Sequence, residues 1–166
     1  MARGKKPLLE NIEIKKIAAE GKSIAYVDEK VLFVPNTVPG DIVDVQVTRK
    51  RKSFLEGFIV NVRKYSDIRT EPFCSHFGIC GGCKWQNLPY QLQTEFKQQE
   101  IIDNLQRIGK VELQNVSPII GSPKTTYYRN KLEYTFCNKR FLTREEIANG
   151  QDIDRTPAVG FHVPGL

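Results

Sequence analysis

Apolar and polar side chains alternate with a period of two through the first part of the chain, up to about residue 65. This period is typical of half-buried strands, because successive side chains of a strand point to opposite faces. Turn residues divide the region into five runs, at residues 12–15, 24–27, 31–34, 42–48 and 54–62. Five short strands without a helix predict a small closed barrel of the OB type, since an open sheet of this size would leave its edges unpaired.

The two longest runs also predict which side chains share a face. The fourth run places three valines on one side of its strand, at Val43, Val45 and Val47. The fifth run is expected to do the same with Phe58, Val60 and Val62. One face of each strand is therefore predicted to be half-buried.

The turn between these two runs carries four adjacent cations, Arg49, Lys50, Arg51 and Lys52, which we call the cationic turn. Because like charges repel, these four side chains do not pack against one another. In a complex with nucleic acid they would neutralise phosphates, and each contact would release counterions. The alternative is a solvated turn. Three aromatic side chains nearby offer faces for base stacking, or else belong to the core or the sheet surface: Tyr26, Phe33 and Phe54.

The chain has 166 residues and a net charge of +6, which is unevenly distributed. Residues 1–70 hold 14 basic and 9 acidic side chains, whereas residues 71–166 hold 11 and 10. A basic module beside a nearly neutral one suggests a polyanion partner, most simply nucleic acid; the alternative is a soluble domain that its charge keeps apart from others. No apolar run is long enough for a bilayer and no secretory signal is recognisable, so we expect a cytoplasmic protein without a membrane partner.

Three cysteines form the pattern C-x5-C-x2-C, at Cys74, Cys80 and Cys83. Cytoplasmic thiols stay reduced, so cysteines there are expected to be ligands or spectators more often than disulfides. The two glycines between Cys80 and Cys83 let the backbone turn tightly and bring its N–H groups close to sulfur. This spacing in a glycine-rich loop indicates a metal or iron–sulfur centre, and the strand–helix context of a redox dithiol is missing.

Both zinc and a cubane cluster require four ligands, and the identity of the fourth is open. His76 lies inside the loop and is more often solvent-facing in such a place. Cys137 is expected on the polar side of a strand, opposite Leu132, Tyr134 and Phe136. It is either the fourth ligand or a spectator, in which case the true fourth ligand lies elsewhere.

The rest of the chain predicts one helix and one strand pair. Leu88 to Gly109 is expected to be a docking helix with one apolar stripe, Pro89 in its first turn and Gly109 as its C-cap. A strand from about residue 131 to 136 and a second over 158–162 are expected to pair, with a polar loop from about residue 138 to 157 between them. The predicted domains are 1–66, a barrel; 67–110, the cysteine loop and helix; and 111–166, the start of an α+β domain that looks cut short.

These residues resemble the RNA (uracil-5-)-methyltransferase family, and the match runs through the chain in order. Residues from about 8 to 65 resemble its TRAM domain, a basic OB-type barrel. The string Phe73-Cys74, Cys80-Gly-Gly-Cys83 and Trp85-Gln86 is similar to its 4Fe–4S loop, and residues 88–109 to the helix after it. Tyr128-Arg-Asn-Lys131 resembles the start of its central RNA-binding domain, which adds Arg129 and Lys131 to the predicted RNA-binding residues, and Val159-Gly-Phe-His162 resembles the returning strand of that domain.

The resemblance implies an enzyme that methylates C5 of a uridine in RNA, with ribosomal 23S RNA favoured over transfer RNA. It implies a further C-terminal domain that binds S-adenosylmethionine, adds a cysteine to C6 of the uracil and removes the C5 proton with a carboxylate. It also places the fourth cluster cysteine past Leu166. This chain alone is then the RNA-recognition part, is expected to be inactive and monomeric, and contains no residue that we assign to catalysis.

Four other functions fit less of the sequence. A transfer-RNA uridine methyltransferase would share most motifs, and a stand-alone nucleic-acid-binding module with a zinc site would share the barrel and the cysteines. Radical enzymes with TRAM domains usually have a C-x3-C-x2-C spacing and place the barrel after the catalytic domain. A structural protein with inert cysteines would bind neither iron nor zinc.

Overall fold

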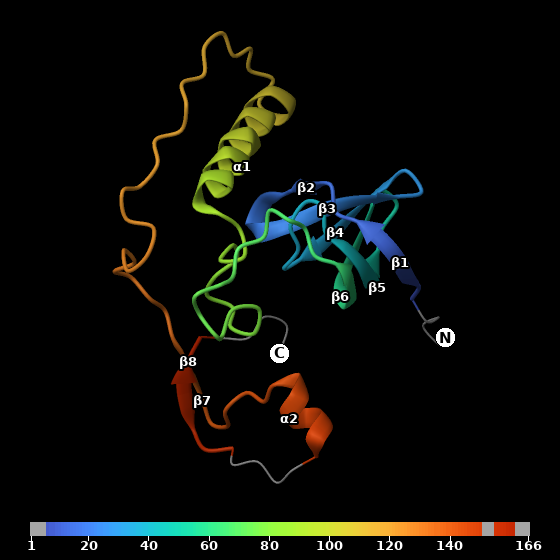
Figure 1. Ribbon diagram of the computed structural model, residues 1–166, viewed down its shortest axis with the longest axis vertical. Helices are drawn as coiled ribbons and strands as arrows, with labels where there is room; N and C mark the ends of the chain where they lie inside the picture. Colours follow the sequence, from blue (N-terminus) through green and yellow to red (C-terminus); the bar gives the residue numbers. More distant parts are fainter. Residues whose placement is uncertain (1–5, 151–154, 162–166) are drawn as a thin grey trace. The chain divides into compact units, whose positions relative to one another are not determined.

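The computed structural model describes residues 6–150 and 155–161 (Figure 1). It divides into two compact units: Met1–Pro72 with Trp85–Ser122, and Phe73–Lys84 with Pro123–Leu166. Within the described residues, no helix has both the length and the apolar character needed to cross a membrane.

Six strands form one curled sheet in the first unit. The strands are β1 (Leu8–Glu13), β2 (Lys16–Ile17), β3 (Lys22–Val27), β4 (Lys30–Pro35), β5 (Ile42–Lys50) and β6 (Phe54–Lys64). Their order across the sheet is β1-β5-β6-β4-β3-β2, and each neighbouring pair is antiparallel except β4 and β6, which are parallel. A one-turn 3-10 helix, Ala19–Gly21, connects β2 to β3.

The two outermost strands of this sheet, β1 and β2, are consecutive in the chain. Only Ile14 and Lys15 separate them, and both residues continue the hydrogen bonding: the Ile14 N–H donates to the Asp41 carbonyl at 2.9 Å, and the Lys15 N–H donates to the Ile24 carbonyl at 2.8 Å. The six strands thus correspond to the five predicted ones, with the first divided in two. Because this bent strand pairs at both ends of the sheet, the fold is of the OB type, as the alternating pattern predicts.

The barrel core consists of small apolar side chains that alternate along the strands. Val43, Val45 and Val47 are all buried, which confirms the predicted face of this strand. They pack with five further buried residues: Ile14, Ala25, Leu32, Val34 and Leu55.

The predicted face of the last strand is wrong at two positions: Val60 is 56% exposed, and Phe58 lies on the side of the strand opposite the core-facing Ile59. Asp44 pairs with Asn61 and Val45 pairs with Ile59, so Val60 is an extra residue without a partner on β5. Such a β-bulge reverses the alternation of side chains on one strand. Ile59 and Val62 therefore pack against the core, on either side of the bulge.

The helix that follows the cysteine loop is shorter than predicted. Helix α1 spans Tyr90–Asp103, with Pro89 as its N-cap, and a π-helical turn, Asn104–Ile108, continues it to Gly109. Leu88 is buried but precedes the helix. The second half of the expected apolar stripe borders an open groove of about 330 Å³ with Leu113, Val116 and Ile119. No residue of α1 is buried, so the first unit covers the stripe only in part.

The second unit contains the predicted strand pair, reduced to β7 (Thr135–Cys137) and β8 (Ala158–Gly160), which pair antiparallel. The predicted continuation to His162 lies outside the described residues. Within the expected polar loop, residues Arg144–Asn149 form helix α2, which was not among the predicted elements. Its signal was a capping box: the Thr143 hydroxyl accepts from the Glu146 N–H, and the Glu146 carboxylate accepts from the Thr143 N–H.

Candidate nucleic-acid interface

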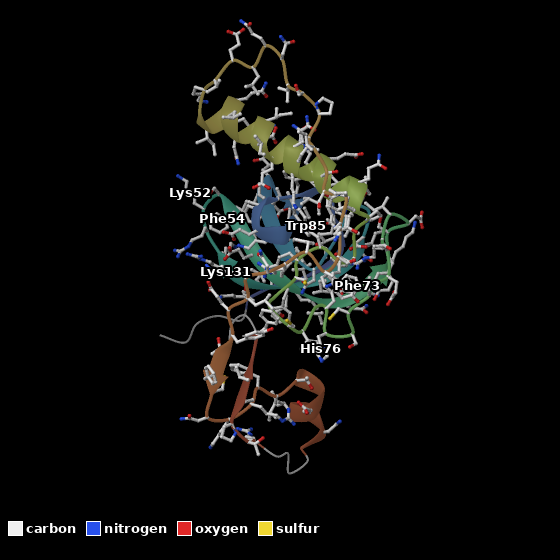
Figure 2. The ribbon with its side chains drawn as sticks, turned by 90° about the vertical axis from the view of Figure 1, so that its left-hand side faces the viewer. Lys52, Phe54, Phe73, His76, Trp85 and Lys131 are labelled. Carbon is white, nitrogen blue, oxygen red and sulfur yellow. The ribbon has the colours of Figure 1, made fainter. Side chains whose placement is uncertain are left out.

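The cationic turn joins β5 to β6 and is closed by a hydrogen bond from the Arg51 N–H to the Phe54 carbonyl at 2.9 Å. All four of its cationic side chains are exposed. Arg49 lies 3.4 Å from the Glu56 carboxylate, and its guanidinium lies 5.9 Å from the centre of the Phe54 ring. Among the described residues, the other three form no ion pair, so their charge is available to an anionic partner. Lys52 and Phe54 lie at the same end of the barrel in Figure 2.

Two buried carboxylates, Asp41 and Asp44, accept hydrogen bonds from several segments of the barrel. Asp41 is fully buried, and Arg69 forms two hydrogen bonds to it, of 2.6 and 2.8 Å. Asp44 accepts from the Asn11 N–H, from Asn61 and from Arg63. These donors stabilise the charged form, chiefly the Asn11 amide, and they lower the pKa of Asp44.

In the second unit, the structure keeps the cysteine loop compact through hydrogen bonds of its own backbone. The Cys80 N–H donates to the His76 carbonyl at 2.9 Å, and the Gly82 N–H donates to the Cys80 sulfur at 3.3 Å. The second bond is the N–H···S contact expected from the glycine pair. A Cβ on Gly82 would lie 3.6 Å from the Phe161 ring and 3.3 Å from the Cys80 sulfur, which explains why glycine suits this position.

The loop does not assemble a finished metal centre. Within the described chain, no three Cys, His, Asp or Glu side chains converge on a point where they could hold an ion. His76 is exposed, and Cys137 is partly buried on β7, where it lines a small pocket with Phe141 and Phe161. Cys137 is less exposed than its neighbour Phe136, which is opposite to the predicted sidedness of this strand. Phe141 and Phe161 line the pocket on the Cys137 side of the strand, whereas Phe136 is 85% exposed.

Arg129 and Lys131, the other predicted RNA-binding residues, belong to the second unit. Both are exposed, and Lys131 forms an ion pair with Glu133 at 3.4 Å in which both side chains are largely solvated. Tyr127 and Tyr128 next to them are also exposed, at 99% and 68%. The cationic turn thus lies on the barrel, whereas Arg129 and Lys131 lie on a segment without regular secondary structure.

Comparison with known proteins shows which proteins this chain is similar to. The TRAM domain family model matches residues 10–60, which cover most of the barrel. An uncharacterized RNA methyltransferase of Bacteroides thetaiotaomicron is 54% identical over 149 residues, which are 90% of this chain and 33% of that protein. The chain is a relative of the RNA methyltransferases. This confirms the resemblance inferred from the barrel and the cysteine motif.

The names of two further similar proteins include the substrate of each. A 23S rRNA (uracil(1939)-C(5))-methyltransferase of Francisella tularensis subsp. novicida is 37% identical over 160 residues, 89% of this chain and 36% of that protein. The Pyrococcus abyssi tRNA (uracil-54, C5)-methyltransferase, solved with S-adenosyl-L-homocysteine, is 26% identical with a TM-score of 0.42, over 70% of this chain and 24% of that one. This RNA methyltransferase relative spans about a third of the length of the curated proteins it matches.

Proposed function

We propose that this chain is the RNA-recognition part of an S-adenosylmethionine-dependent methyltransferase that methylates C5 of a uridine in 23S ribosomal RNA. The observation that carries the proposal is a TRAM barrel with an exposed cationic turn, in a chain that is 37% identical to a 23S rRNA uracil methyltransferase. The barrel contributes the phosphate contacts, and Arg129 and Lys131 contribute further ones. Phosphate contacts position a protein on RNA without reading its sequence.

In this proposal, the catalytic step belongs to a C-terminal domain outside this chain, as the resemblance to the family implies. S-adenosylmethionine, when bound there, supplies the methyl group. The residues of this chain bind and orient the RNA, so that one uridine is held where it can leave its stack.

Methylation is tested with the full-length protein that contains this chain, S-adenosylmethionine and unmodified 23S ribosomal RNA. We expect 5-methyluridine at one position, detected by nuclease digestion and mass spectrometry. Unmodified transfer RNA serves as the competing substrate. Methylation of transfer RNA alone would favour the transfer-RNA enzyme, and methylation of neither would overturn the proposal.

We also propose that Cys74, Cys80 and Cys83 supply three ligands of a 4Fe–4S cluster in the full-length protein. Three thiols in a glycine-rich loop and the Gly82 N–H···S contact support soft-metal binding, since such amides stabilise thiolate charge. The loop has to rearrange for its thiols to converge, and the fourth ligand comes from outside the loop. Anaerobically purified full-length protein is expected to be brown and to contain iron; zinc without iron would favour a zinc module, and the absence of both would favour inert thiols.

A further inference from the structure

An open apolar groove runs along one side of α1, between the helix and the segment that follows it. Its volume is about 330 Å³. We call it the α1 groove. Six aliphatic side chains line its walls, three from the helix with its π-helical turn and three from the segment after them: Ile101, Ile102, Leu105, Leu113, Val116 and Ile119.

Hydrogen bonds between side chains of the helix and the following backbone hold the two walls together. The Gln98 side chain donates to the Ser117 carbonyl at 3.0 Å and accepts from the Ile119 N–H at 2.9 Å. Further along the same segment, the Ser122 N–H donates to the Tyr90 hydroxyl at 2.6 Å. The walls are therefore fixed relative to each other, and the apolar surface between them stays open.

The described residues do not cover the apolar side of this helix. None of the described residues of α1 or of its π-helical turn is buried, and Ile101 and Ile108 are 56% and 79% exposed. A helix of this length is marginal on its own in water, and most helical stability in proteins comes from the packing of an apolar face. We therefore expect α1 to be stabilised by a further apolar surface that fills the groove.

The composition of the walls indicates the chemistry of that surface. The described residues that line the α1 groove include no aromatic ring and no charged side chain. RNA would need rings for its bases or cations for its phosphates, so the groove does not suit RNA. Aliphatic side chains pack closely against other aliphatic side chains, as they do in protein interiors. The walls therefore favour an aliphatic protein segment.

The length of the relatives favours a segment of the same polypeptide. Two curated relatives are about three times as long as the part that matches this chain. A segment attached through the polypeptide has an effective concentration on the order of mM, whereas a second copy has to bind from dilute solution.

We propose that the α1 groove is the docking site for an aliphatic segment of the catalytic part of the full-length protein, outside this chain. The groove and the barrel belong to the same compact unit, so docking there fixes the catalytic part relative to the barrel. This inference rests on the proposed function only in placing the chain within a longer protein, and it does not depend on which RNA is methylated.

Cross-linking in the full-length protein identifies the occupant directly. A photoreactive diazirine amino acid replaces Ile101 or Val116, one on each wall, and Gln106 is the control position because it is exposed but does not line the groove. Ultraviolet light is expected to join positions 101 and 116 to residues beyond 166 of the same polypeptide, as identified by mass spectrometry of the digested protein. This product is expected to be absent for position 106.

Other cross-linked products would overturn the docking proposal. A product of twice the protein mass would show that a second copy fills the groove. A product formed only with added RNA would show that RNA occupies it. Cross-links confined to residues 1–166 would show that this chain closes the groove by itself.

Two aspartate variants of the full-length protein test whether docking stabilises α1. Leu105→Asp and Gln106→Asp introduce the same charge at neighbouring positions of the π-helical turn, but only Leu105 lines the groove. Leu105→Asp is expected to raise the hydrogen-exchange rates of the α1 amides roughly ten- to 150-fold, which corresponds to the loss of one buried leucine. The barrel amides serve as the internal reference and are expected to keep their protection. Equal exchange of α1 in the two variants would overturn the docking proposal.

The docking proposal and the proposed function fail separately. Cross-links from the groove to residues beyond 166, in a protein that methylates neither ribosomal nor transfer RNA, would overturn the activity and support docking. Methylation of 23S ribosomal RNA by a protein without these cross-links would support the activity and overturn docking.

Discussion

At the scale of single residues, Gly57 lies where the neighbouring strand leaves no room for a side chain. Gly57 lies on β6 opposite Val47, with its Cα facing β5. A Cβ added there would collide with the Val45 side chain and would lie 2.7 Å from the Gln46 carbonyl. The second contact is with backbone, which cannot rotate away. Glycine is therefore required at this position of β6.

Gly57→Ala is expected to destabilise the barrel by about 1–3 kcal/mol, since β5 and β6 must separate to admit the methyl group. The measurement is the midpoint of urea unfolding followed by circular dichroism. Gly160→Ala on β8 is the matched control, because a Cβ there has open space around it. Equal midpoints for the two variants would show that the close approach carries no cost.

A second residue-scale prediction concerns Glu146, whose pKa is lowered to about 2, mainly by hydrogen bonds from Arg140 and also by the Thr143 amide. The unfolded chain binds this proton more tightly than the folded one. The carboxylate therefore stabilises α2 above the ordinary glutamate pKa, and this contribution is lost as the pH falls through about 2. Carbon-13 NMR titration is expected to give a midpoint near 2 that rises toward the ordinary value in Arg140→Met. A midpoint unaffected by this substitution would contradict the assignment.

At the scale of elements, a buried ion pair connects the segment after the barrel to the turn before β5. Asp41 accepts from the Val38 and Ser66 amides and from Arg69, and Arg69 also donates to the Asn36 carbonyl. The Tyr65 ring lies 5.1 Å below the same guanidinium. One arginine thus holds together segments that are 28 residues apart in the chain.

Arg69→Met is expected to destabilise the first unit by about 3–5 kcal/mol, because Asp41 would remain buried without its cation. Arg107→Met is the control, since its ion pair with Asp103 is solvated and is expected to contribute about 0–1 kcal/mol. The free energy of unfolding in urea is the measurement. Asp41→Asn combined with Arg69→Met is expected to cost less than the sum of the two single changes; strict additivity would argue against direct coupling.

At the scale of the whole molecule, the distribution of charge predicts how the chain meets RNA. Most of its net charge of +6 comes from the first 70 residues, and the largest exposed group of cations in that region is the cationic turn. A fixed cluster of this kind attracts a polyanion before any specific contact forms. Its contribution is distinguishable from stacking because it alone depends steeply on salt.

Replacing Arg49, Lys50, Arg51 and Lys52 together by Ala is expected to weaken binding to single-stranded RNA. The slope of log affinity against log salt is expected to fall by up to about 3, because each lost phosphate contact removes about 0.7. Arg107→Ala with Lys110→Ala removes two exposed cations near the end of the helix and is expected to leave the slope unchanged. A quadruple variant with the wild-type slope would exclude the turn from phosphate binding.

The sequence alone determined the elements whose signals are local. The period of two specified the barrel strands and the Val43, Val45 and Val47 face, and the cysteine spacing with the barrel pattern indicated the family. The capping box of α2 is also a local signal, but the polar composition of residues 138–157 led to the prediction of a loop. Each of these follows from side-chain direction or from hydrogen bonds within a few residues.

Only the tertiary structure decided what depends on residues far apart. The bulge at Val60 arises from the register of β6 against β5, and the division of the first strand arises from pairing with two different neighbours. The contact between the Phe33 and Phe54 rings likewise exists only because β4 and β6 run side by side. Strand register and sheet order are set by the summed packing of the whole barrel, so no short segment contains that information.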